Sequence, residues 1–157
     1  MRDILFRGKR VDNGEWIEGF FVAMDGESLI YAQSDLQFDG SFAEIFGLAD
    51  DAQETKIVGM EVFQVIPETV GQYTGLKDKN GKRIFEGDVV HILGNQQVED
   101  WKNVNYNASI AFLDGGFCAI DGTIEEHGFR RYALARMDFD LEVIGNIHDN
   151  SELLKEE

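Results

Sequence analysis

The sequence predicts an all-β fold with a minor helix, made of an N-terminal antiparallel meander and a small C-terminal barrel. Short runs rich in β-branched and aromatic residues recur along the chain, Asp-Gly and Asn-Gly turn signals separate them, and only one segment has clear helical spacing. Seventeen glycines against one proline suit turns built on positive φ. At 157 residues, the chain suits one domain, or two small subdomains that share a core.

The first part of the chain is expected to form the meander. Residues 4–11 read as a first strand, with side chains alternating between two faces, and residues 16–24 form the return strand after a turn at 12–14. A turn at Asp25-Gly26 then leads into a third strand at residues 28–32.

A short helix is predicted at residues 42–49. Ser41 and Glu44 have the spacing of a capping box, and apolar residues follow at i, i+3, i+4 and i+7. An acidic linker leads to a strand at residues 56–66, which Pro67 ends because proline has no backbone N–H to donate. Apolar residues on both faces of this strand predict burial on both sides, between the two subdomains.

Residues 69–90, TVGQYTGLKDKNGKRIFEGDVV, carry the densest turn chemistry of the chain. Residues 78–81, Asp-Lys-Asn-Gly, are typical of a tight turn in which Gly81 takes positive φ. Gly87 then bends the chain, and the Asp88 carboxylate is placed to accept nearby backbone N–H groups. A strand rich in β-branched residues follows at 88–93 and is expected to enter the core.

The remaining elements are predicted from the same signals. Strands are expected at residues 104–113, 117–120 and 140–147, with a hairpin turn at 114–116, while residues 132–137 fit either a strand or a helix. Asn150 and Ser151 are expected to cap a last helical turn at the C-terminus.

The central stretch resembles the signature of the YopX family, as do the opening MRDILFRGK and the closing VIGNIHDNSELL at 143–154. The resemblance implies an all-β fold with an SH3-like small barrel in its second part. We therefore expect a meander subdomain with the short helix at residues 1–68 and a barrel subdomain at residues 69–157. YopX proteins occur largely in phages and prophages, and the resemblance implies no biochemical activity because the family is essentially uncharacterised.

The charge of the chain limits its partners. The net charge is −16, and residues 11–55 contain eleven acids and no Lys or Arg. Such a field repels nucleic acid and anionic membranes, because affinity for DNA comes mainly from neutralised phosphates. The N-terminus lacks the apolar core of a signal peptide, and no run approaches membrane-spanning length, so a cytoplasmic protein of a bacterial host is expected.

No catalytic, cofactor-binding or metal-ligating residue is predicted. Cys118, the only cysteine, lies in an apolar run where a buried inert thiol is expected. His91 fits a half-buried strand position, and none of the three histidines lies at ligand spacing from another. Glu86 and Asp88 could form a catalytic pair, but adjacent turn acids are usually structural.

Two basic clusters stand out from this acidic background. They are the candidate partner-binding residues: Lys77, Lys79, Lys82 and Arg83, and then Arg130, Arg131 and Arg136. The second cluster interleaves with aromatic residues, as single-stranded nucleic-acid binding would require, but the cations equally suit pairing with acids of a neighbouring subunit. We therefore expect a phage or prophage accessory protein that binds a phage or host protein, non-catalytic and homo-oligomeric. The alternative is a nucleic-acid-associated factor built on the SH3-like barrel, and an enzyme ranks third.

Overall fold

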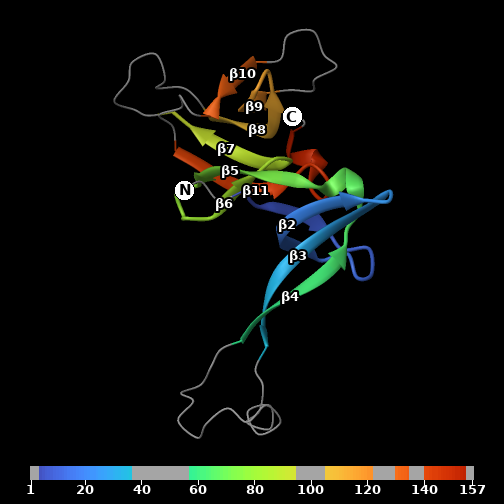
Figure 1. Cartoon of the computed structure of the whole chain (residues 1–157). Helices are drawn as coiled ribbons and strands as arrows, with labels where there is room; N and C mark the ends of the chain where they lie inside the picture. The colour runs from blue at the N-terminus through green and yellow to red at the C-terminus, as the bar shows by residue number, and fades with distance from the viewer. Residues whose placement is uncertain (1–3, 37–56, 95–104, 122–129, 135–139, 155–157) are drawn as a thin grey trace, which may run out of the picture.

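The computed structural model describes residues 4–36, 57–94, 105–121, 130–134 and 140–154 (Figure 1). These residues confirm the all-β prediction. The strands are β1 (Phe6–Lys9), β2 (Trp16–Met24), β3 (Glu27–Leu36), β4 (Ile57–Gln64), β5 (Gly71–Lys77), β6 (Arg83–Phe85), β7 (Asp88–Leu93), β8 (Asn105–Leu113), β9 (Gly116–Asp121), β10 (Arg130–Ala133) and β11 (Asp140–Asn146). Two short 3₁₀ helices, η1 (Pro67–Thr69) and η4 (Ser151–Leu154), complete the described elements.

The strands form two antiparallel sheets. The first has six strands in the order β4-β3-β2-β1-β5-β6, and the second has five in the order β10-β9-β8-β7-β11. Within the described residues neither sheet closes on itself, so the SH3-like barrel expected from the resemblance is not confirmed. Strands β5 and β6 pair on the far side of β1, and the first sheet therefore extends beyond residue 69.

The predicted hairpin turns are confirmed in detail. Asp25 and Gly26 connect β2 to β3 with φ of 53° and 83°, and Asp114 and Gly115 connect β8 to β9 with φ of 51° and 82°. Two successive positive φ angles are the signature of a type I′ turn, whose twist matches that of the flanking strands. The C-terminal helical turn is also present, as the 3₁₀ helix η4.

The position of β4 corrects one prediction. Burial of this strand on both sides, between two subdomains, is wrong, because β4 is the edge strand of the first sheet and Val62 is 49% exposed. Figure 1 shows β3 and β4 as a long ribbon that extends away from the other strands. The predicted helix at 42–49 lies outside the described residues.

The main core is formed by residues of the second sheet together with one residue of the first sheet. Its buried members come from β6, β7, β8, β9 and β11 and from the residue after β10: Ile84, Val90, Ile92, Ala108, Ile110, Ala119, Leu134 and Leu141. Ile84 belongs to β6 of the first sheet and is fully buried in this cluster. The central stretch thus fastens the two sheets together by hydrophobic packing as well as by its turns.

Candidate functional site

The turn between β5 and β6 is held by one aspartate. Asp78 Oδ1 accepts hydrogen bonds from the backbone N–H of Asn80 at 2.8 Å and of Lys82 at 2.9 Å. Asp78 Oδ2 accepts a third from Val143 N–H of β11 at 3.1 Å. Although burial by itself would raise the pKa of Asp78, these backbone donors hold it below its usual value. Gly81 has φ of 83°, as predicted for this turn.

This turn displays the first basic cluster, which we call the basic turn (Lys77, Lys79, Lys82 and Arg83). Two of its cations are engaged within the chain, since Lys79 Nζ lies 2.5 Å from Glu142 and Arg83 Nη1 lies 2.9 Å from Glu18. Lys77 and Lys82 are exposed and form no ion pair with any described residue. Among the described residues, these two cations are therefore available to a partner.

The second basic cluster is only partly described. Arg130 and Arg131 lie in β10, which pairs with β9 at the edge of the second sheet, and nothing is described of their side chains. Arg136 lies outside the described residues. The structure therefore gathers the first predicted cluster in one turn and leaves the second untested.

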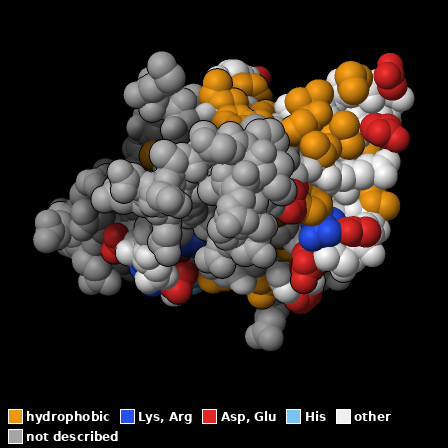
Figure 2. Space-filling view, turned by 60° about the horizontal axis from the view of Figure 1, so that its bottom comes forward, with side chains coloured by type: hydrophobic (Ala, Val, Ile, Leu, Met, Phe, Trp, Pro, Cys, Tyr) orange, Lys and Arg blue, Asp and Glu red, His pale blue; other side chains and the backbone are white. Residues whose placement is uncertain are grey.

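An exposed apolar face lies on β2, β3 and β4, and no sequence pattern had marked it as a surface. It consists of Phe20, Val22, Met24, Leu29, Tyr31 and Val62. Alternate residues of β2 share one side of the sheet, and the directly paired residues of β3 and β4 lie beside them. Phe20 is 57% and Met24 is 55% exposed. In Figure 2, hydrophobic side chains gather on the right of the described surface, with acidic side chains at their margin.

The opposite side of the same strands is buried in part. Ile30, between Leu29 and Tyr31 on β3, has no exposed surface, and Ala32 is also buried. Both sides of this ribbon thus carry apolar residues, unlike the apolar-in, polar-out alternation of an ordinary half-buried sheet. Contiguous exposed apolar surface of this kind is typical of an interaction site.

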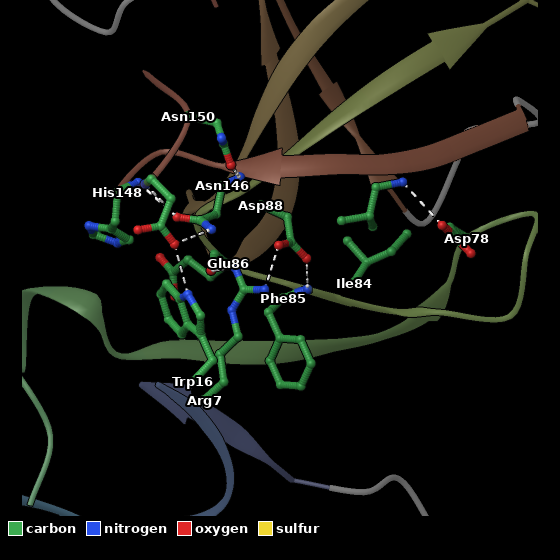
Figure 3. Close-up of polar contacts among 12 residues, drawn as sticks. Arg7, Trp16, Asp78, Ile84, Phe85, Glu86, Asp88, Asn146, His148 and Asn150 are labelled. Atoms are coloured by element: carbon green, nitrogen blue, oxygen red, sulfur yellow. Dashed lines mark hydrogen bonds and ion pairs between the residues drawn. The ribbon is translucent and has the colours of Figure 1, made fainter. Parts of the chain in front are cut away.

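A buried ion pair joins the two sheets (Figure 3). Arg7 Nη1 of β1 lies 2.5 Å from Asp88 Oδ1 of β7, and Asp88 Oδ2 accepts the Phe85 N–H at 2.7 Å. The guanidinium also lies over the rings of Trp16, at 4.8 Å, and Phe85, at 5.1 Å. The interpretation that Asp88 accepts a backbone N–H at this bend is confirmed.

The burial of Asp88 decides its role. Its residue has no exposed surface, and this burial raises the pKa of the carboxyl although the Arg7 charge and the Phe85 N–H oppose the shift. The neighbouring Glu86 carboxylate accepts the backbone N–H of Phe112 at 3.3 Å. A carboxylate buried between two sheets cannot contact a substrate. Asp88 therefore has a structural role, which is to hold the two sheets together through Arg7.

The Asp149 carboxylate forms the centre of a second group of polar contacts between the sheets. Its carboxylate accepts Trp16 Nε1–H at 2.9 Å and Asn146 Nδ2–H at 3.0 Å, and it pairs with Lys9. Hydrogen bonds from Lys9, Asn146 and Trp16 hold the pKa of Asp149 far below its usual range. The His148 ring lies 5.9 Å from the Trp16 ring, and burial together with the nearby Arg7 charge lowers the pKa of His148.

The remaining candidates for chemistry have structural places. Cys118 is buried, as predicted, with Sγ 3.9 Å from the Gly116 carbonyl oxygen. His91 is half-buried and contacts Asn107 Oδ1 through Nδ1 at 2.8 Å, also as predicted. Within the described ranges, no three His, Cys, Asp or Glu side chains gather as metal ligands would, and no helix is long and apolar enough to span a membrane.

Comparison with known proteins supports the family assignment. The chain is similar to protein EF1440 from Enterococcus faecalis, whose crystal structure matches with a TM-score of 0.52 and 23% sequence identity, over 99% of this chain and 100% of that one. At this identity the likeness concerns the fold alone. No curated protein matches the sequence. The model of the family described as YopX protein matches residues 6–155, nearly the whole chain, and the protein therefore belongs to the YopX family.

Proposed function

We propose that this protein acts by binding, without catalysis, and that it associates with itself through the apolar face. The observation that carries the proposal is the set of large apolar side chains displayed together on β2, β3 and β4, of which Phe20 and Met24 are more than half exposed. Exposed apolar surface is costly in water, and a partner that covers it gains free energy from its burial.

The positions of two candidate catalytic groups support a binding role. The Asp88 carboxylate pairs with Arg7 between the two sheets, and the Cys118 thiol is buried in the second sheet. General acid–base or nucleophilic catalysis requires such groups within hydrogen-bond reach of a substrate, which neither position offers.

We further propose a role as an accessory protein of a phage or prophage, in the cytoplasm of the bacterial host. The resemblance of the central stretch to YopX proteins supports this setting. The division into subdomains at residues 1–68 and 69–157, the second derived from an SH3-like barrel, stays part of the proposal. Five antiparallel strands around one apolar core support a barrel-like origin of the second sheet.

The nucleic-acid alternative gains little from the geometry of the basic turn. Lys79 and Arg83 are paired with Glu142 and Glu18, which leaves two cations against a net charge of −16. We expect no binding of labelled single- or double-stranded DNA at physiological salt. Micromolar affinity with a steep salt dependence would place the alternative first.

Self-association is tested by measuring the solution mass of the full chain over a range of concentrations. The parent should reach a dimer or a larger assembly, and Val62→Ser should weaken it by removing apolar area from the face. Val11→Ser is the matched control, because Val11 is 55% exposed but lies outside the face. A parent that stays monomeric up to about 100 μM, well above the micromolar range of specific contacts, would contradict the proposal.

A further inference from the structure

We infer that the occupant of the apolar face is the basic turn of a second copy of this chain, docked reciprocally in a two-fold dimer. The inference rests on the proposed self-association and adds to it which surfaces meet.

Two acids without an ion pair among the described residues lie at one end of the apolar face. Asp25 and Glu27, in the turn and at the start of β3, are exposed and form no ion pair with a described residue. Strands β2, β3 and β4 contain no Lys or Arg. Pairing two such faces at this end would bring together acids of the same sign, and none of the three strands supplies a Lys or Arg between them.

The basic turn has the complementary chemistry. Lys77 and Lys82 are exposed and unpaired among the described residues. The turn is also rigid, since Asp78 accepts three backbone N–H groups. A preorganised turn loses little conformational entropy when it docks. Two exposed cations match the two acids at the end of the apolar face.

The relative position of the two surfaces allows the dimer to close. The ion pair between Arg83 and Glu18 brings the base of the basic turn beside β2. Glu18 lies two residues before Phe20 on this strand, so both side chains point to the same side of the sheet. Each copy therefore presents a basic turn and an apolar face on one side, and a two-fold axis lets each turn meet the face of the other copy.

Charge reversal with reciprocal rescue tests this arrangement. The dimer dissociation constant is measured by sedimentation for the full-length parent, Glu27→Lys, Lys77→Glu and the double variant. Each single variant should weaken the dimer about tenfold, because it turns two attractive contacts into repulsive ones. The double variant should recover most of the parent affinity, and added salt should weaken the parent dimer.

The controls separate this inference from the proposal beneath it. Glu68→Lys changes an exposed acid on η1, outside the three strands that carry the face, and should leave the dissociation constant within about twofold of the parent. Unchanged circular dichroism and melting show that the variants are folded. If Val62→Ser weakens the dimer while both reversals have no effect, the apolar face is an interface but the basic turn does not occupy it, and the inference is wrong. A parent that is monomeric at all concentrations overturns the inference and the self-association together, and leaves a different, basic-rimmed protein as the occupant.

Discussion

Replacing Asp88 by asparagine removes the charge that faces Arg7 but keeps an oxygen that can accept the Phe85 N–H. The Arg7 side chain is 11% exposed and that of Asp88 is 1% exposed, so the remaining guanidinium would keep its charge with little access to water. Removing one partner of a buried ion pair typically lowers the free energy of unfolding by about 3–5 kcal/mol. This is a large share of the total free energy of unfolding of an ordinary domain, which is about 5–15 kcal/mol. We expect Asp88→Asn to lower the free energy of unfolding by about 3 kcal/mol or more.

A double-mutant cycle with Arg7→Met, measured by urea denaturation at pH 7, isolates the coupling between the two charges. Arg7→Met leaves the Asp88 carboxylate buried without its cation and should cost a similar amount. In the double variant neither charge remains, and the Arg7 Nε that has no hydrogen-bond partner among the described residues is also removed. The double variant should therefore lose much less than the sum of the single losses. Losses that add within about 0.5 kcal/mol would refute the coupling of the pair across the sheets.

Three further predictions concern single positions. Gly81→Val should lower the melting temperature clearly more than Gly81→Asn, because φ of 83° disfavours a β-branched residue; equal melting would mean that the turn relaxes. Asp78→Ala leaves three backbone N–H groups without their acceptor and should lower the free energy of unfolding, measured with denaturant, by about 1–3 kcal/mol. Lys77→Ala should change it by no more than about 0.5 kcal/mol. Similar losses for the two variants would contradict the assignment of Asp78 as the support of the turn. The pKa of His148 is lowered in the folded state, so the unfolded chain binds more protons below its ordinary value of about 6.5 and stability falls as the pH drops through that range. His148→Gln should flatten the dependence of melting on pH between about 7 and 5, and an unchanged slope would count against a role for this histidine.

The parts of the fold that depend on a few adjacent residues were predictable. The turns at Asp25-Gly26 and Asp114-Gly115 and the turn that ends at Gly81 follow from the φ preferences of Asp, Asn and Gly, which act within four residues. The strands that flank them follow from the period-two pattern, and the places of Cys118 and His91 follow from the apolar runs around them. Local chemistry was sufficient because none of these features requires a distant partner.

Part of the candidate site could also be predicted from the sequence. All four cations of the basic turn could be predicted to cluster, because they lie within seven consecutive residues. Which of them are available was not predictable, since Glu142 and Glu18, which engage Lys79 and Arg83, come from other strands of the fold.

The junction between the sheets and the apolar face depended on the tertiary structure. Lys9 and Asp149 are 140 residues apart, and neither local sequence predicts that the two side chains pair. The alternation of β4 predicts which of its residues share a side, but apolar residues on both sides do not show that both sides are packed. Whether a side is covered depends on the neighbours that the sheet order supplies, and β4 received an edge position that leaves Val62 in solvent. Periodicity describes one strand at a time, whereas burial is a property of the assembled sheets.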